Sequence, residues 1–240
     1  MVLAAAGLLV VALIVTVVAT ASAGGSGAGP GSRAVSVTSG AVGTVDLEGV
    51  PGQLTITGSA HGPIRLTGQL NWSGHAPYAA VRTGPATGGQ AAAGRTLHLD
   101  YVCAAASPCT GDYRLSVPAG TAVVLSQPSG HVIISGLAGR LRISAASVDV
   151  SATGLRTPAL EASITSGHLA ATFARAPRQL SLVLGSAQAT VRLPAVSPGY
   201  QVSQQVTSGY VHTGVATAAS SPYQVNAQIS SGELELLSSG

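Results

Sequence analysis

The side chains that could do chemistry in this sequence are few and scattered. The 240 residues include 8 Asp and Glu residues. Glycoside hydrolysis needs two carboxylates that face one cleft, roughly 5–10 Å apart. Asp46 with Glu48, and Glu233 with Glu235, have the two-residue spacing that places side chains on one face of a strand. We expect both pairs to keep exposed terminal strands soluble, and Asp149 stands alone among Ser and Ala.

The 6 histidines show no metal-ligand spacing. His131 and His168 occupy equivalent places in non-adjacent repeats, with Ser147 between them. Such a pair is either a weak metal or proton-sensitive site, or two solvated imidazoles near turns, and we favour the second interpretation. The chain has no G-x-S-x-G elbow, P-loop or Gly-rich nucleotide fingerprint. We therefore predict no catalytic residue, no metal site and no cofactor.

Cys103 and Cys109 are the only two cysteines, and they flank a Ser-Pro turn. Two thiols alone make a poor zinc site, because zinc takes four ligands. In an exported chain, two cysteines this close together indicate a local disulfide. We predict a Cys103–Cys109 bond.

Aromatic side chains make up only 3% of the chain. A carbohydrate platform would need several of them on one face. Tyr200, Tyr210 and Tyr223 lie close together in the sequence and would fall on the last repeats. These three tyrosines are the predicted contact surface.

The elements that must position these residues form a repeat. Bursts of alternating polar and apolar residues recur about every 20 residues, and each is followed by a small-residue turn and a second burst. The sequence SGHVIISGLAGRLRIS, residues 129–144, is one example. The first bursts begin near Val123, Leu141, Leu160, Leu180, Tyr200 and Tyr223.

Within each second burst, a polar or small residue follows the turn and an apolar residue comes next. Side chains alternate between faces along a strand, so one row meets solvent and the next enters a core. The predicted outward row is His131, Ser147, His168, Tyr210 and Glu233. The predicted inward row is Val132, Val148, Leu169, Val211 and Leu234.

Two short strands per repeat cannot bury a face alone, but successive repeats stacked about 4.8 Å apart can. The sequence therefore predicts an all-β fold over residues 35–240. We expect a β-solenoid that resembles a right-handed parallel β-helix, with about 20 residues per two-strand coil. A β-sandwich of hairpins is the alternative, since strands near 10 residues apart also permit it. We prefer the solenoid because the copies resemble one another in sequence.

Residues 112–139, DYRLSVPAGTAVVLSQPSGHVIISGLAG, resemble the bacterial putative-adhesin domain family. These are exported or membrane-anchored β-solenoid proteins, largely of unknown function. The resemblance rests on the L-x-V-P-A-G entry at 115–120, the recurring Ser-Gly before an alternating strand, and the order of apolar segment, spacer and paired cysteines. It covers roughly residues 40–237. The resemblance implies fold and location, and it carries over no catalytic residues.

The N-terminal segment from Val2 to Ala23 contains no charged side chain. As a helix it would extend roughly 33 Å, enough to cross a hydrocarbon core of about 30 Å. We predict a transmembrane or signal-anchor helix over 1–23, followed by a Gly/Ser/Pro-rich linker over 24–34. A secretory signal cleaved near Ala23 is the alternative. Either arrangement places the bulk of the chain outside the cytoplasm, on the cell membrane or secreted.

The net charge is +3, and the arginines are scattered rather than gathered in a basic run. This argues against nucleic-acid binding, which needs a concentrated basic patch. We predict a non-catalytic, membrane-tethered extracytoplasmic module, an adhesin or cell-envelope interaction protein that contacts envelope polysaccharide or surface proteins. The alternatives are an accessory of envelope-stress sensing and, less favoured, a polysaccharide-active β-helix enzyme. The sequence does not indicate an oligomeric state.

Overall fold

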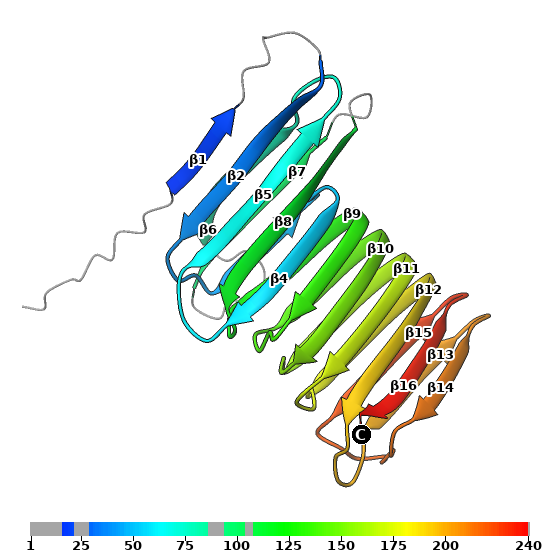
Figure 1. The fold of residues 1–240 in the computed structure, drawn as a ribbon. Helices are drawn as coiled ribbons and strands as arrows, with labels where there is room; N and C mark the ends of the chain where they lie inside the picture. Colours follow the sequence, from blue (N-terminus) through cyan, green and yellow to red (C-terminus); the bar gives the residue numbers. More distant parts are fainter. Residues whose placement is uncertain (1–15, 22–28, 86–93, 104–107, 240) are drawn as a thin grey trace, which may run out of the picture.

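The computed structural model describes residues 16–21, 29–85, 94–103 and 108–239. In these ranges the chain forms strands and no helix, which confirms the all-β prediction (Figure 1). All 16 strands belong to one hydrogen-bonded network. The strands lie one after another in an elongated stack, so the core runs along the length of the molecule.

Four long strands form the middle of the stack. Each pairs in parallel with the next, with offsets of 18, 19 and 20 residues, as in Val123↔Leu141, Leu141↔Leu160 and Leu160↔Leu180. Hairpins of the alternative sandwich would pair antiparallel. The strands are β9 (Ala122–Ser135), β10 (Leu141–Leu155), β11 (Ala159–Phe173) and β12 (Gln179–Pro194).

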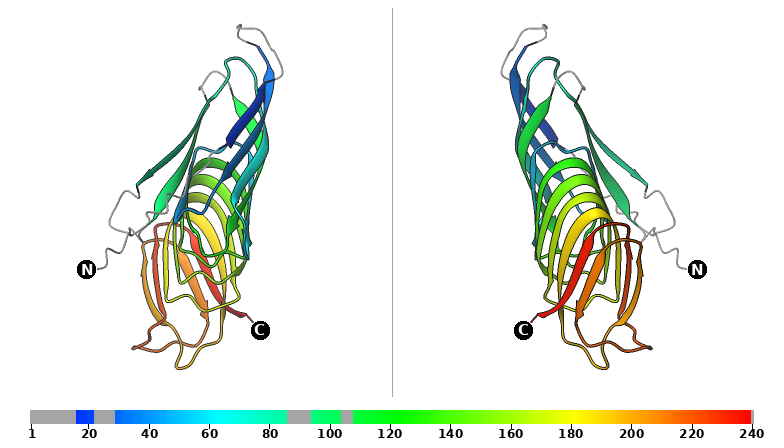
Figure 2. Two further views of the ribbon diagram at one scale, coloured as in Figure 1. Left: turned by 90° about the vertical axis from the view of Figure 1, so that its left-hand side faces the viewer. Right: turned by 90° about the vertical axis from the view of Figure 1, so that its right-hand side faces the viewer.

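Each long strand turns a corner and contributes to two faces. In β10 the alternation of buried and exposed side chains is interrupted at Ala146 and Ser147, which are both exposed. We call the side before this corner face A and the side after it face B. Figure 2 shows the strands on the two sides of the stack, with the core enclosed between them.

Glycine occupies the corner of β9 and of β11. Gly130 and Gly167 have φ of 128° and 110°, a region that L side chains rarely adopt. A Cβ atom at Gly167 would also collide with the carbonyl oxygen of Val148 in the preceding coil. The Ser-Gly signal in the sequence therefore marks a corner at which neighbouring backbones approach closely.

The paired positions correct the predicted rows at one repeat. Val148 pairs with Gly130 at the corner, and Asp149 pairs with His131. Val150, which is 3% exposed, therefore takes the place that was predicted for Val148 in the inward row. The prediction took Ser147 as the equivalent of His131, whereas Asp149 is the true equivalent, so both rows move by two residues in this repeat. Val148 is still buried, at 1% exposed.

The two ends of the stack do not follow the order of the chain. Next to β9 lie β3 and β4, and the later strands β7 and β8 lie outside them. Next to β12 lie β15 and β16, and the earlier strands β13 and β14 lie outside them. The bounds are β3 Thr44–Glu48, β4 Gln53–Ser59, β7 Arg95–Val102, β8 Cys109–Pro118, β13 Gln201–Val206, β14 Tyr210–Gly214, β15 Gln224–Ile229 and β16 Glu233–Ser239.

Antiparallel strands extend the N-terminal end. On face B, β8 pairs with β5 (Ile64–Trp72), β5 with β2 (Gly31–Ser39), and β2 with β1 (Thr16–Ala21). On face A, β7 pairs with β6 (Tyr78–Pro85). Strand β2 includes residues 31–34, which the sequence assigned to the linker.

The predicted N-terminal helix is not shown. Residues 16–21 fall within it, and they form strand β1 instead. Their sequence TVVATA is rich in β-branched residues, which favour strands, and the edge of β2 offers backbone groups for pairing. The rest of 1–23 lies outside the described residues. Across the part of the chain that the structure describes, no helix is long and apolar enough to cross a membrane.

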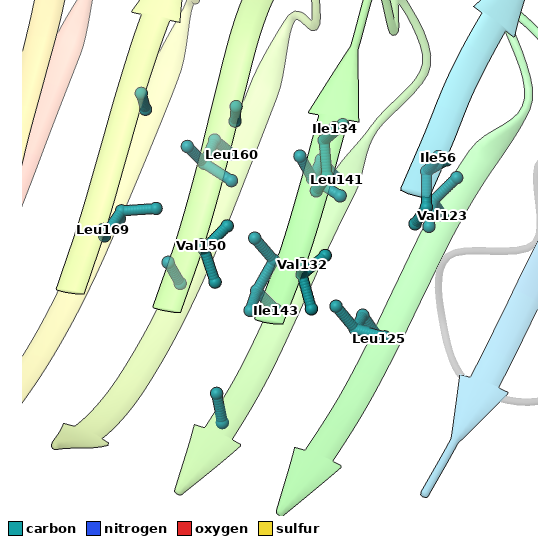
Figure 3. Close-up of a cluster of buried hydrophobic side chains, with 14 of the residues drawn as sticks. Ile56, Val123, Leu125, Val132, Ile134, Leu141, Ile143, Val150, Leu160 and Leu169 are labelled. Atoms are coloured by element: carbon teal, nitrogen blue, oxygen red, sulfur yellow. The ribbon is translucent and has the colours of Figure 1, made fainter. Parts of the chain in front are cut away.

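The core consists of aliphatic side chains that point inward from both faces. In Figure 3, Val132, Val150 and Leu169 lie behind one another on successive strands of face B. Ile143 and Leu160 come from face A. These five side chains are at most 3% exposed. Stacking identical register positions lets Val, Leu and Ala fill the interior with almost no aromatic side chains.

Candidate functional site

Face B carries a line of polar side chains at one register position. His131, Asp149 and His168 occupy this position on β9, β10 and β11. Neighbouring members are one strand spacing apart, roughly 4.8 Å. We call the full set the polar column: His131, Asp149, His168, Gln188, Glu233 and Tyr210.

The two histidines of the column are linked through Asp149 rather than separated by Ser147. His168 Nδ1 lies 3.1 Å from Asp149 Oδ1, and His168 Nε2 lies 3.1 Å from Gln188 Oε1. Ser147 lies at the corner instead, where its Oγ is 3.0 Å from that of Ser166. Asp149 is therefore not alone, as the sequence suggested. A repeat offset that grows from 18 to 20 residues hides this alignment from a fixed 20-residue period.

The members of this hydrogen-bonded chain face the solvent. The side chains of His168 and Asp149 are 67% and 58% exposed. A solvated pair of this kind has little electrostatic coupling. The neutral imidazole of His168 can donate from only one ring nitrogen, so the other partner must offer a donor or the ring must carry a second proton. The arrangement can exchange hydrogen bonds with a ligand along its length.

The two carboxylate pairs lie on different faces of the molecule. Asp46 and Glu48 belong to β3 on face A, where Asp46 Oδ2 lies 3.2 Å from His98 Nδ1. Glu233 and Glu235 belong to β16 on face B. The coils of β9 to β12 lie between the pairs, so they do not share a cleft. Neither pair lies on an outermost coil, which corrects the expectation of terminal strands. Among the described residues, no group of three His, Cys, Asp or Glu could hold a metal ion.

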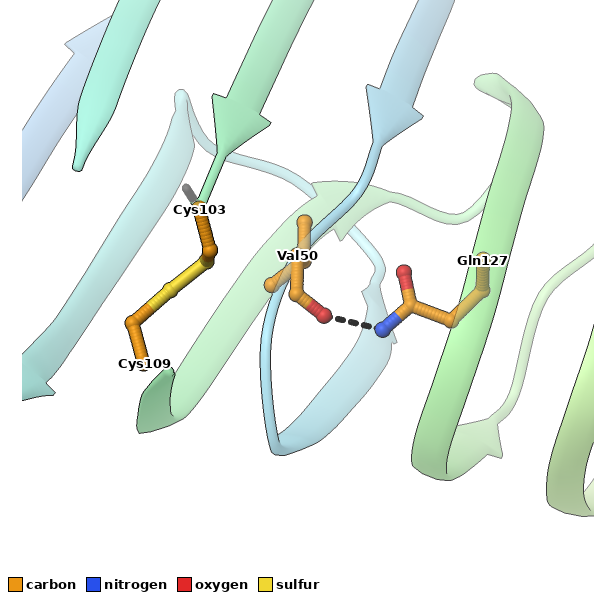
Figure 4. Close-up of a disulfide and its surroundings, with 4 residues drawn as sticks. All are labelled: Val50, Cys103, Cys109 and Gln127. Atoms are coloured by element: carbon orange, nitrogen blue, oxygen red, sulfur yellow. Dashed lines mark hydrogen bonds between the residues drawn. A yellow bond between two sulfur atoms is a disulfide. The ribbon is translucent and has the colours of Figure 1, made fainter. Parts of the chain in front are cut away.

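The predicted disulfide is confirmed. Cys103 and Cys109 are bonded, with their Cα atoms 5.9 Å apart (Figure 4). Cys103 directly follows β7 on face A, and Cys109 begins β8 on face B. The bond therefore closes the corner of the coil that these two strands form. It occupies the place that Ser-Gly corners take in the middle of the stack.

The three predicted contact tyrosines do not form one exposed platform. Tyr200 is 1% exposed, and its hydroxyl donates to the Pro194 carbonyl oxygen at 2.7 Å. Its ring meets that of Tyr223 edge to face, with centroids 5.9 Å apart. Burial raises the pKa of Tyr200 to about 12. Tyr210 alone is strongly exposed, at 58%, and it lies in the polar column. The shared Tyr-Gln-Val at 200–202 and 223–225 was the available signal, because equal positions stack.

Comparison with known proteins gives matches among solved structures only. No family model matches the chain. No curated protein matches it. A putative cell adhesion protein from Clostridium sporogenes is similar, with 11% identity and a TM-score of 0.49, over 82% of this chain and 92% of that one. A putative adhesin from Parabacteroides merdae has 9% identity and a TM-score of 0.26, over 87% and 96% of the two chains.

A putative adhesin from Parabacteroides distasonis is also similar, with 11% identity and a TM-score of 0.26, over 86% of this chain and 97% of that one. The chain thus spans nearly the full length of all three structures. The structures similar to this chain are named as adhesins or as a cell adhesion protein, the class that the sequence of residues 112–139 resembles.

Proposed function

We propose that the protein is a non-catalytic, adhesin-like module that contacts polysaccharides or proteins of the cell envelope through face B. In this proposal the stacked coils are a β-solenoid, and the polar column is the contact surface. The observation that carries it is the column itself: six coils each present one polar side chain at the same register position. A linear polymer along the stack would meet one such group per coil, and weak contacts repeated in this way add up to useful avidity.

Binding rather than turnover is supported by the exposure of the column. Acid–base catalysis depends on groups whose environments tune their pKa values, which usually requires burial or a close charge. Asp149 and His168 are more than half exposed. Solvated groups of this kind suit reversible hydrogen bonding to a polar surface.

We further propose that the module lies outside the cytoplasm, held at the membrane by the uncharged N-terminal segment or secreted after cleavage near Ala23. The Cys103–Cys109 disulfide supports this location, because such bonds persist in oxidising compartments. Fractionation of cells that express a C-terminally tagged chain tests it. Tagged protein in the membrane pellet supports anchoring, and protein in the medium supports cleavage. Recovery from the cytosol contradicts both.

The binding proposal is tested by retention on insoluble cell-wall polysaccharide. The variant replaces Asp149, His168 and Gln188 together by Ala. A matched control replaces Arg142, Glu161 and Ser181, which occupy one register position of face A on the same three strands. The two triple variants thus compare equal positions on opposite faces.

We expect the face B variant to lose most of its retention and the face A control to keep it. Equal retention of both variants would contradict a contact surface on face B. The same incubation is assayed for new reducing or unsaturated ends. Turnover that disappears in the face B variant would replace the binding module by an enzyme.

A further inference from the structure

A shallow groove lies on the outer surface of face A. It forms where the β6–β7 hairpin meets the coils of β3, β9, β10 and β11, and its volume is about 710 Å³. In Figure 2 this hairpin diverges from the coils that follow it. The volume falls within the range of about 300–1,000 Å³ that is typical of small-ligand sites. The groove is on the opposite side of the stack from the polar column.

Hydroxyl groups form the floor of the groove. Ser126, Ser144 and Ser163 occupy one register position on β9, β10 and β11, and all three line the groove. The same row continues to Glu48 on β3 and to Asp100 on β7. A ligand along the floor would meet three groups that donate and accept hydrogen bonds, followed by two carboxylates that accept them.

The side wall carries an aromatic ring and a guanidinium group. Tyr78 and Arg82 lie four residues apart on β6, so they point to the same side of the strand. Tyr78 is 62% exposed, although a residue of this size usually covers apolar surface. Arg82 pairs with Asp100, and this hydrogen bond raises the pKa of Arg82. The ion pair fixes the guanidinium against the floor and leaves much of it free, because the Arg82 side chain is 69% exposed.

The wall also contains a buried amide that lacks one partner. Gln127 lines the groove and is 2% exposed. Its Nε2 donates to the Val50 carbonyl oxygen and, at 3.1 Å, to that of Ser129. Figure 4 shows the bond to Val50 and the amide oxygen turned away from it. Within the described residues, Gln127 Oε1 has no hydrogen-bond partner. A buried acceptor without a donor is unfavourable, and a donor that enters at the groove would relieve it.

We propose that this groove binds a neutral oligosaccharide. A sugar ring has an apolar face that packs on an exposed aromatic ring such as that of Tyr78. Its hydroxyl groups can donate to Glu48, Asp100 and Gln127 Oε1, and they can accept from the serines and Arg82. The two carboxylates outnumber the single guanidinium, so an anionic sugar is repelled. The proposal is independent of the function proposed for face B, because the two sites share no residue.

The test titrates the full chain with neutral hexasaccharides of glucose and of N-acetylglucosamine, and follows the heat of binding. We expect saturable binding of at least one of them and at least tenfold weaker binding of a hexamer of galacturonic acid. Preference for the anionic oligomer, or no binding of any neutral oligomer, would overturn the proposal. A neutral hexapeptide is titrated in parallel, and tighter binding of the peptide at the groove would also overturn it.

The variants locate the site. We expect Tyr78→Ala to weaken binding at least tenfold, and Tyr210→Ala, which removes a similarly exposed ring on face B, to leave it unchanged. Arg82→Ala is paired with the control Arg142→Ala, whose side chain is exposed on β10. All four side chains are exposed, so the variants should melt like the wild type. Equal effects of the groove variants and their controls would contradict the site. The triple variant in the polar column should keep oligosaccharide binding, which separates the two proposals.

Discussion

The middle and the ends of the stack solve the same packing problem differently. From β9 to β12 each coil is a single long strand that turns a corner, and successive coils follow the order of the chain. At both ends the coil consists of two separate strands, and the order in space is permuted. A coil in the middle has a neighbour on each side, so a local repeat is enough to define it. A terminal coil lacks one neighbour, so other contacts must hold it.

The two ends supply those contacts unequally. The N-terminal end is extended by antiparallel strands, closed by the Cys103–Cys109 disulfide, and packed with Tyr101 and Tyr113, whose rings lie edge to face at 5.3 Å. At the C-terminal end, β13 and β14 are mostly exposed. No Asp, Glu, Lys or Arg occurs between residues 193 and 232. We therefore expect the middle to be the most stable part, and the coil of β13 and β14 the least.

The largest expected difference comes from one substitution made at two positions of the same inward row. Val150→Asp in the middle buries a carboxylate among aliphatic side chains and should reduce the free energy of unfolding by about 4 kcal/mol. Val211→Asp at the terminal coil places the charge at a partly buried site and should cost about 1 kcal/mol. Urea unfolding of both variants measures the difference. Similar losses at the two positions would mean that the terminal coil is packed as tightly as the middle.

A smaller difference is expected between two glycines with positive φ. Gly167 (φ 110°) lies at a corner in the middle, and Gly62 (φ 124°) lies in a loop at the N-terminal end, where nothing lies within 4 Å of the point that a Cβ atom would occupy. Gly167→Ala adds a collision with a neighbouring backbone to the strain of the dihedral angle, and should cost about 3 kcal/mol. Gly62→Ala should cost about 1 kcal/mol, from the strain alone. Thermal melts that lower both variants equally would remove close approach as the reason for corner glycines.

Removal of the disulfide tests how the N-terminal end is held. Cys103→Ser with Cys109→Ser opens a loop with a sequence separation of 6 residues. The expected loss is about 2 kcal/mol, from the larger entropy of the unfolded chain. Amide hydrogen exchange should rise in β7 and β8 and stay constant in β10 and β11. Faster exchange throughout the stack would show that the corner bond holds more than its own coil.

Alkaline pH should act on the ends and spare the middle. Burial raises the pKa of Tyr101 to about 12 and that of Tyr200 to about 12, and it also raises the pKa of Tyr113. A raised phenol pKa means that the folded state holds the proton more tightly than the unfolded state. The stability from this source is complete below pH 10 and is lost as the pH rises towards 12. The loss should be less than about 1 kcal/mol per tyrosine at pH 10.5.

No tyrosine occurs between residues 122 and 194, so hydrogen exchange in β9 to β12 should be the last to respond. Tyr200→Phe is the matched variant, because it keeps the ring and removes the titrating hydroxyl. It should make the C-terminal end insensitive to pH in this window. An alkaline transition that begins in the middle would contradict the comparison.

The sequence predicted the middle of the molecule well and the ends poorly, for physical reasons. Alternation and Ser-Gly corners are local signals, and they located β9, β11 and β12 with the correct inward residues. Val148 at a corner in place of glycine removed the signal in β10, and the register there was missed. The placement of β3 beside β9, and of β15 beside β12, depends on contacts between segments distant in the chain, which no local pattern encodes. The groove on face A was missed because it needs the β6–β7 hairpin, which lies in a Gly/Ala-rich stretch without clear alternation.

The permuted C-terminal end has a consequence for the order in which the chain is assembled. Strand β13 leaves the ribosome before β15, yet its sheet partner in the finished stack is β15. Gln179 of β12 and Gln201 of β13 both pair with Gln224, so β13 arrives with the right register to occupy the place beside β12 for itself. The last strands to be synthesised must then displace it outward. At the opposite end β3 and β4 precede β9, which docks on them directly. The nascent chain is thus free of this competition at its beginning and meets it at its close.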